Sequence, residues 1–279
     1  MTKAWLNNVD VHTEAQLIRD EDAPRILWGD DTSGFVNDVI NLKSKELVVA
    51  TICLPPGGYY RASDTHKAIY DANGCFYVLQ GEYTLQLPDS GEVRTAKAGQ
   101  VILLRGPQLH FGYNFSDQEL RVVEMISPPP EGSHLKDRPL PDPARGVLAK
   151  ALEDYPSSGT RAPWLLDVVG REMALNAVVG SHNPLRLRIF TSSNRISVAA
   201  FDLLSGRRTD SMSMSREAAL YLEQGVLHVR NLTNGRWEKL TAGDVYLLPA
   251  GSEWELFNQS EGRTSGLLVV AGNLNEQLE

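Results

Sequence analysis

The sequence predicts an all-β protein in which one barrel or sandwich module occurs twice. Short segments rich in Val, Ile, Leu, Phe and Tyr alternate with turns such as PDSGE (88–92) and TNG (233–235), a pattern typical of such folds. Two long stretches of the chain resemble each other, and a proline-rich segment separates them. The 279 residues suffice for two domains of ordinary size.

The internal repeat is visible in two pairs of segments. CFYVLQGEYTLQL (75–87) resembles ALYLEQGVLHVRN (219–231), and KAGQVILLRGPQLHFGYN (97–114) resembles TAGDVYLLPAGSEWELFN (241–258). Four pairs of landmarks lie 144 positions apart: Gly81 and Gly225, Gly99 and Gly243, His110 and Trp254, Asn114 and Asn258. Because all four keep one offset inside matching apolar patterns, the chain carries a duplication.

The segment SPPPEGSHLKDRPLPDPARG (127–146) holds six prolines and is therefore not sheet interior. We divide the chain into an N-terminal barrel with an N-terminal extension (1–127), a Pro-rich linker with a helix (128–164) and a C-terminal barrel (165–279). A few short helices are expected to cover the barrels, from the segments HTEAQLIRD (12–20), GVLAKALEDY (146–155) and RAPWLLDVVG (161–170).

The order of these motifs resembles the cupin superfamily. It comprises a PGG run (56–58), a hairpin, the strand FYVLQG (76–81) and a distal motif that ends in His110 and Asn114 in the first copy and in Trp254 and Asn258 in the second. The resemblance implies two tandem cupin barrels (double-stranded jelly rolls), a bicupin. It fits no single subfamily, and cupins range from oxygenases to storage proteins, so the fold alone does not give the function.

Cupins that bind metal hold it with two His and a carboxylate on the first motif and a third His on the second. In the second copy, Met212, Met214 and Trp254 stand at the imidazole positions. Thioether and indole are poor ligands for divalent ions, so we expect this barrel to be filled by those side chains and to hold no metal.

The first copy keeps His110 and has five extra residues between Gly57 and Phe76. There the pattern Asp64, His66, Asp71 stands where the family has H-x-H-x3–4-E. With His110, the resemblance implies a site for one divalent transition metal (Fe, Mn, Ni or Zn). A count from Gly81 instead places the family's glutamate at Gly74. The alternative is therefore a solvated hairpin loop, with His110 at the mouth of a cavity and no metal.

Aromatic residues and one arginine gather in the same module. We expect five residues to contact a substrate: Tyr60, Arg61, Tyr70, Tyr113 and Asn114. The leading hypothesis is a small-molecule enzyme with one metal in the first barrel and a structural second barrel. Its chemistry would be that of a dioxygenase or of a lyase, isomerase or cyclase. The alternative is a metal-free bicupin that binds a sugar or an aromatic acid without catalysis. The sequence designates no catalytic residue.

Charge and hydropathy exclude other classes of partner. The net charge of −8 argues against nucleic acid, and no apolar run of 18 residues predicts a membrane span. The N-terminus lacks the apolar core of a signal peptide, so we expect a cytoplasmic protein. A homodimer is expected because exposed sheet edges need covering.

Overall fold

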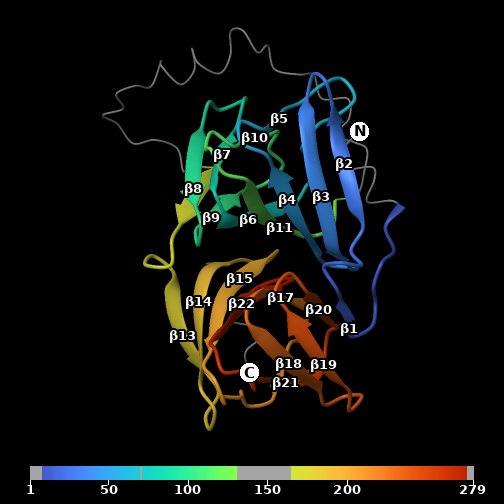
Figure 1. Cartoon of the computed structure of the whole chain (residues 1–279), viewed down its shortest axis with the longest axis vertical. Helices are drawn as coiled ribbons and strands as arrows, with labels where there is room; N and C mark the ends of the chain where they lie inside the picture. Colours follow the sequence, from blue (N-terminus) through green and yellow to red (C-terminus); the bar gives the residue numbers. More distant parts are fainter. Residues whose placement is uncertain (1–7, 70, 131–164, 275–279) are drawn as a thin grey trace.

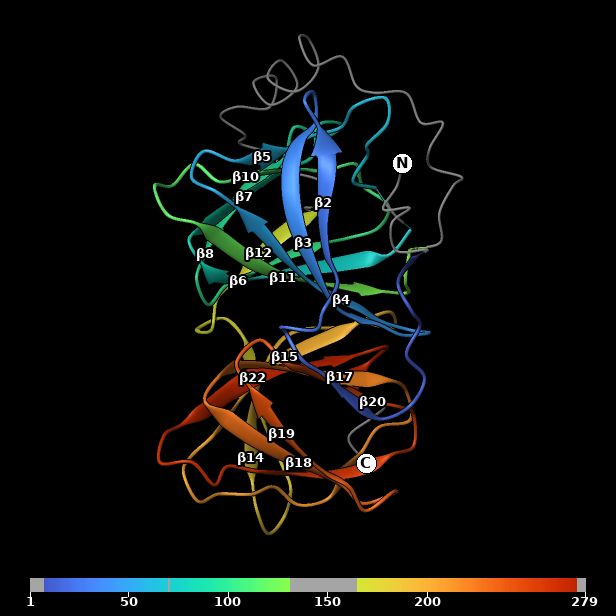
Figure 2. The same ribbon diagram turned by 45° about the vertical axis from the view of Figure 1, so that its right-hand side comes forward.

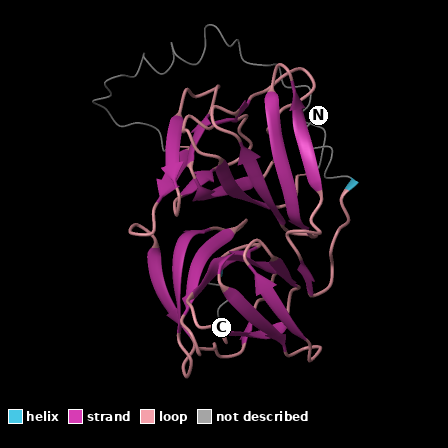
Figure 3. Cartoon of the chain, in the orientation of Figure 1, coloured by secondary structure: helices cyan, strands magenta, loops and turns pink. Residues whose placement is uncertain are grey.

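The structure, a computed structural model, describes residues 8–69, 71–130 and 165–274. Its 22 strands form two modules stacked one on the other, each with a larger and a smaller antiparallel sheet (Figures 1 and 3). This confirms the predicted all-β jelly-roll class. No helix in the described residues is long and apolar enough to cross a membrane.

The first module pairs a seven-stranded sheet with a four-stranded one. In spatial order the larger sheet contains β12 (Leu166–Val169), β9 (Val101–Leu104), β6 (Asn73–Gln80), β11 (Leu120–Ser127), β4 (Val48–Leu54), β3 (Gly34–Lys43) and β2 (Arg25–Asp30). The smaller sheet contains β5 (Tyr59–Tyr60), β10 (Phe111–Tyr113), β7 (Glu82–Gln86) and β8 (Val93–Lys97).

The second module repeats this plan, as the duplication predicts. Its larger sheet contains β1 (Gln16–Ile18), β20 (Val245–Leu248), β17 (Ala218–Gln224), β22 (Thr264–Val270), β15 (Ser197–Leu203), β14 (Leu185–Ser192) and β13 (Leu175–Val179). Its smaller sheet contains β16 (Met212–Ser213), β21 (Glu253–Phe257), β18 (Val226–Asn231) and β19 (Trp237–Thr241).

The landmarks of the repeat are structural. Gly81 and Gly225 have φ values of 81° and 87°, a conformation that glycine adopts without steric cost. The side-chain amide of Asn114 donates to the backbone oxygens of Leu54, Pro55 and Gln118, and that of Asn258 donates to Leu203 and Gly262. Each asparagine therefore ties two loops together at one end of its barrel.

The predicted covering helices are wrong where the structure describes them. The segment 12–20 contributes β1 and the segment 161–170 contributes β12, while 146–155 lies outside the described residues. Within the described ranges the chain contains no α-helix. Both segments have apolar residues that a sheet edge can bury, and tertiary pairing overrides their weak helical preference.

These two strands cross between the modules. β1 pairs with β20 of the second module, with Gln16 opposite Leu247, although the rest of its neighbourhood in sequence belongs to the first. β12 pairs with β9 of the first module, with Leu166 opposite Leu104. Figure 2 shows β1 along the edge of the lower module. The division of the chain at residues 127 and 165 stays a prediction.

Three of the four hydrophobic clusters among the described residues follow from this layering. One fills each module between its two sheets, and the third joins the two larger sheets face to face. The shared core includes Val49 and Met125 from the first module and Ala200 and Leu267 from the second. A polar side chain that points into one of these cores is therefore enclosed, and this is what makes the site below conspicuous.

Candidate functional site

A small cavity lies inside the first barrel, between its two sheets. Its volume is about 10 Å³, which is about the space that holds one water molecule. It is lined by Trp28, Val36, Asp38, Ile52, Tyr60, Ala68, His110 and Glu124. Four of these eight residues are apolar, namely Trp28, Val36, Ile52 and Ala68, so the ionisable side chains lie in a largely apolar interior.

Two carboxyl groups are placed in this interior by strand alternation. Asp38 shares a face of β3 with Val36, and Glu124 shares a face of β11 with Val122, because residues two apart point to the same side. Both neighbours belong to the core of the first barrel. Asp38 is 2% exposed and Glu124 is 1% exposed. Buried carboxyls are rare in protein cores, and two of them beside one cavity mark a candidate functional site.

His110 enters the cavity just before β10 and is 1% exposed. Its Nδ1 lies 3.1 Å from the backbone oxygen of Gln108. A carbonyl oxygen can only accept, so Nδ1 carries the proton and donates. In the neutral ring this leaves the lone pair on Nε2. The rings of Tyr60 and Phe76 lie edge-on to the imidazole, with centroids at 6.1 Å and 5.7 Å, which fixes its orientation.

Beside the imidazole, two phenols form a buried pair. The hydroxyls of Tyr60 and Tyr83 are 2.5 Å apart. Burial raises the pKa of Tyr83 well above its ordinary value, and the nearby carboxyls of Glu124 and Asp38 raise it further. Tyr83 is therefore a neutral hydrogen-bonding group. The Tyr60 ring can lie beside Tyr83 because the residue opposite it in the pairing of β5 and β10 is Gly112. A Cβ on Gly112 would lie 2.3 Å from the Tyr60 ring.

The loop that follows β5 closes the barrel mouth. Its Ala68 lines the cavity, and the Ala68 backbone oxygen accepts a hydrogen bond from the His110 backbone N–H at 3.1 Å. This loop contains the five extra residues of the first copy. Part of the insertion is thus packed into the mouth of the barrel, while Asp64 and Thr65 are exposed.

Asp30, at the end of β2, anchors this loop. Its Oδ2 accepts hydrogen bonds from the hydroxyls of Ser63 and Thr65, both at 2.6 Å, and from Nδ1 of His66 at 2.9 Å. These bonds, the Ser63 bond foremost, hold the pKa of Asp30 well below its ordinary value. The His66 ring also packs edge-on against Trp28, with centroids 5.2 Å apart. His66 therefore fastens the loop that covers the cavity.

The four residues predicted as metal ligands do not come together. Only His110 lines the cavity. His66 is bonded to Asp30, Asp64 is exposed, and Asp71 pairs with Arg195 of the second module at 3.2 Å. Among the described residues, no three or more His, Cys, Asp or Glu side chains are arranged to hold a metal ion. A cupin metal would find suitable donor types in His110, Asp38 and Glu124, but not a ligand cluster.

The residues predicted to contact substrate do not lie together at the cavity either. Tyr60 lines the cavity, and Tyr70 lies outside the described residues. Arg61 is exposed and lies over the rings of Tyr59 and Tyr113, 4.8 Å and 5.4 Å from their centroids. The Tyr113 hydroxyl donates to Gln86 at 2.8 Å. Asn114 makes the loop contacts described above, so Arg61, Tyr113 and Asn114 all lie away from the cavity.

Asp38, Glu124 and Trp28 are the site residues that sequence reasoning missed. A signal existed for the two carboxyls, because each interrupts an apolar strand, in FVNDVI (35–40) and RVVEMIS (121–127). That their strands face one cavity depends on pairing across the sheet. β3 and β11 are both neighbours of β4, on opposite sides, and no local pattern shows this.

In the second barrel, apolar side chains fill the space between the two sheets. As predicted, Met214 and Trp254 are buried in its core, 2% and 1% exposed, among aliphatic residues, and Met212 packs against that core. Met212 also opposes Trp254 in the ladder between β16 and β21. The fold is thus kept in both modules, whereas the second barrel carries the buried Trp254 where the first carries the buried His110.

Comparison with known proteins supports the fold. No family model matches the chain, and no curated protein matches its sequence. Oxalate decarboxylase from Lactobacillus farciminis, solved as a formate complex, is similar over 94% of this chain and 88% of its own, with a TM-score of 0.67 and 16% identity. A putative glyoxylate-induced protein from Pseudomonas aeruginosa matches over 94% and 90%, with a TM-score of 0.67 and 15% identity. AerE from Microcystis aeruginosa matches over 89% and 97%, with a TM-score of 0.58 and 9% identity. At these identities the likeness shows the fold, and that fold is the cupin fold.

Proposed function

We propose that this protein is a small-molecule enzyme whose reaction takes place inside the first barrel. The observation that carries the proposal is the convergence of His110, Asp38, Glu124 and the Tyr60–Tyr83 pair on one buried cavity. Burying two carboxyls and an imidazole costs stability that an apolar filling would not. The second barrel, with the same fold, has the apolar filling, so folding alone does not require these groups.

The residues present support proton transfer. His110 holds its Nδ1 proton on the Gln108 carbonyl, which leaves Nε2 as the atom that can take a proton from a substrate and return it. Tyr60 can donate to a substrate oxygen, since its partner Tyr83 can supply the proton of the hydrogen bond between them. One group that accepts and another that donates are the minimum for lyase, isomerase or cyclase chemistry.

A dioxygenase would need a redox metal at the same cavity. His110, Asp38 and Glu124 offer donor types that such metals accept, but they form no ligand cluster. No step is therefore assigned to a metal, and proton transfer is the function that the geometry favours. Metal content belongs to the test below, because a bound ion would move the proposal to the metal-dependent class.

The substrate class follows from charge and size. Two carboxyls in a dry cavity repel an anion, so we expect a neutral or cationic molecule with hydrogen-bond donors, a polyol or sugar rather than an acid. This separates the chain from oxalate decarboxylase, whose name denotes a small acid. A cavity of about 10 Å³ admits such a molecule only if the loop over the barrel mouth opens, a motion common in enzymes.

The test is a ligand screen by thermal unfolding with monosaccharides, polyols, amines and small acids. Wild type is compared with His110→Gln and with His228→Gln, a matched histidine variant in the second module. We expect one neutral or cationic class to raise the melting temperature of wild type and His228→Gln but not of His110→Gln. Product analysis of any hit separates turnover from binding without catalysis.

Metal analysis completes the test, after incubation with Mn²⁺, Fe²⁺, Ni²⁺ or Zn²⁺. A stoichiometric metal that His110→Gln loses and His228→Gln keeps would replace proton transfer by metal-dependent chemistry. If acids alone bind, the charge reasoning is wrong. If His110→Gln and His228→Gln respond alike to every compound and metal, the first barrel is not the site.

A further inference from the structure

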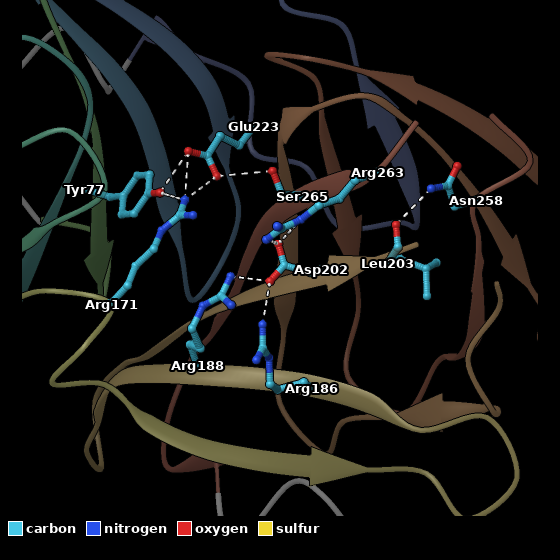
Figure 4. Close-up of polar contacts among 10 residues, drawn as sticks. All are labelled: Tyr77, Arg171, Arg186, Arg188, Asp202, Leu203, Glu223, Asn258, Arg263 and Ser265. Carbon is cyan, nitrogen blue, oxygen red and sulfur yellow. Dashed lines mark hydrogen bonds and ion pairs between the residues drawn. The ribbon is translucent and has the colours of Figure 1, made fainter. Parts of the chain in front are cut away.

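Three arginines surround one aspartate on the larger sheet of the second module. Asp202, on β15, accepts hydrogen bonds from Arg188 of β14 and from Arg263, which precedes β22 (Figure 4). Arg186 adds an ion pair at 3.5 Å. Burial acts to raise the pKa of Asp202, but the bonds and charges of Arg263 and Arg188 outweigh it and lower the pKa. Asp202 is therefore ionised and neutralises only part of the positive charge.

A fourth arginine stands beside this cluster, where the two modules meet. Nη2 of Arg171 donates to the Tyr77 hydroxyl at 2.7 Å and to the two carboxylate oxygens of Glu223 at 3.2 Å and 3.1 Å (Figure 4). Tyr77 belongs to the first module and Glu223 to the second. The charges of Arg171 and Asp202 also attract each other, although no hydrogen bond joins the two side chains in Figure 4.

A surface groove is lined by two of these four arginines, Arg171 and Arg263. Its volume is about 550 Å³, within the range of about 300–1,000 Å³ usual for small-molecule sites. Residues that line it include Arg171, Glu223, Gly225, Ser260, Arg263 and Ser265. It is far larger than the barrel cavity, and it shares no residue with it.

The guanidinium groups in the groove keep unused donors. Arg263 donates hydrogen bonds from Nε and Nη2 to Asp202, and Arg171 donates from Nη2 to Tyr77 and Glu223. Across the described part of the chain, Nη1 of each of these arginines has no hydrogen-bond partner. The buried Nε atoms of Arg171 and Arg188 also lack one there. Each guanidinium has five N–H donors, so the groove presents donors without acceptors.

The local charge is opposite to that of the whole chain. The sequence carries a net charge of −8, yet Arg171, Arg186, Arg188 and Arg263 face only Asp202 and Glu223 among their ion-pair partners. Positive charge that is concentrated on an acidic protein attracts anions to one place. Asp202 is an example of such an anion, because its carboxylate accepts hydrogen bonds from both Nε and Nη2 of Arg263.

We propose that this groove binds an anionic small molecule through its carboxylate or phosphate groups, held by Arg171 and Arg263. Guanidinium binds both groups with paired, charge-assisted hydrogen bonds. The groove volume calls for more than an inorganic ion, so the class is an organic phosphate or a polycarboxylate. The site is separate from the barrel cavity and does not depend on the function proposed there.

The test is calorimetric titration with citrate, pyrophosphate and inorganic phosphate in a chloride buffer of low ionic strength. Losing one charge-assisted bond weakens binding about tenfold or more, so Arg263→Gln and Arg171→Gln should each raise Kd by that factor. The matched control is Arg230→Gln. Arg230 is 44% exposed, forms an ion pair with Glu255 and lies over the Trp237 ring, while Arg263 is 49% exposed. This control should bind like wild type.

A further variant, Asp202→Asn, tests whether removing a competing carboxylate strengthens anion binding. Asp202→Asn removes the carboxylate that competes for Arg263 and Arg188 and should lower Kd, whereas a variant that merely loosens the fold would raise it. Equal affinities of Arg263→Gln and Arg230→Gln, or an unchanged or weaker affinity of Asp202→Asn, would overturn the proposal. Binding that every variant retains would show diffuse surface attraction and would overturn it as well.

Discussion

Gly112→Ala tests whether the Tyr60–Tyr83 pair depends on the missing side chain of Gly112. A Cβ at this position would lie 2.3 Å from Cε1, 2.6 Å from Cζ and 2.9 Å from the hydroxyl of Tyr60. To restore ordinary contact the ring must move by roughly 1 Å. The hydroxyls are 2.5 Å apart and buried, so this movement breaks or strains their hydrogen bond.

Three effects determine how much Gly112→Ala changes the free energy of unfolding. Overpacking a core costs about 1–3 kcal/mol, and a buried hydroxyl left without its partner costs about 1–3 kcal/mol. Replacing Gly by Ala gains about 0.4–1 kcal/mol, because the unfolded chain is restricted. We expect the free energy of unfolding to fall by about 3 kcal/mol. Denaturant titration followed by Trp fluorescence measures it.

Two further variants isolate the cause. At Gly262 a Cβ meets nothing within 4 Å, so Gly262→Ala should leave the free energy of unfolding within about 0.5 kcal/mol of wild type. In a Tyr60→Leu background the ring is gone, and Gly112→Ala should cost much less, a coupling that a double-mutant cycle reports. If Gly112→Ala costs no more than Gly262→Ala, or costs the same in both backgrounds, the reasoning is refuted.

Three other perturbations give distinct expectations. The pKa of the Asp30 carboxyl is lowered from its ordinary value of 3.8 in the folded protein. The carboxylate therefore stabilises the fold at pH values above 3.8, and this stabilisation is lost progressively as the pH falls below 3.8. The stability gap between wild type and Asp30→Asn, followed by denaturant titration from pH 7 to 2, should therefore shrink with acidification, and a constant gap would contradict this. Tyr77→Phe removes the hydroxyl bonded to Arg171 and Glu223 and should lower the free energy of unfolding by about 0.5–1.5 kcal/mol, measured the same way. Burial raises the pKa of Cys75 to about 12, so a thiol reagent should modify the half-buried Cys53 first and reach Cys75 only on unfolding, as mass spectrometry of partially labelled protein would reveal.

The repeat made the fold predictable, because its landmarks carry out local tasks. Gly81 and Gly225 need positive φ, and Asn114 and Asn258 tie loops, so spacing in the sequence preserves them. The strand exchange was not predictable, because β1 pairs with residues more than 200 positions away, Gln16 with Leu247. Nothing local distinguishes such a three-residue edge strand from a turn of helix.

The site was only partly predictable, for a related reason. His110 was found because it stands on a motif. Asp64, His66 and Asp71 were aligned to ligand positions by counting through an insertion, and counting cannot tell a hairpin from a loop folded into the barrel mouth. Asp38 and Glu124 stand on no motif. Their meeting depends on the order of β3, β4 and β11 in the sheet, which is a property of the assembled structure.

The exchange of β1 and β12 makes the two modules mutually dependent. Expressed alone, residues 21–130 would leave β9 paired only with β6, and residues 170–279 would leave β20 paired only with β17. An uncovered edge invites pairing with other chains, and each half would also expose its share of the common core. Each module thus covers a sheet edge and a core face of the other, so the second barrel supports the module that holds the candidate site.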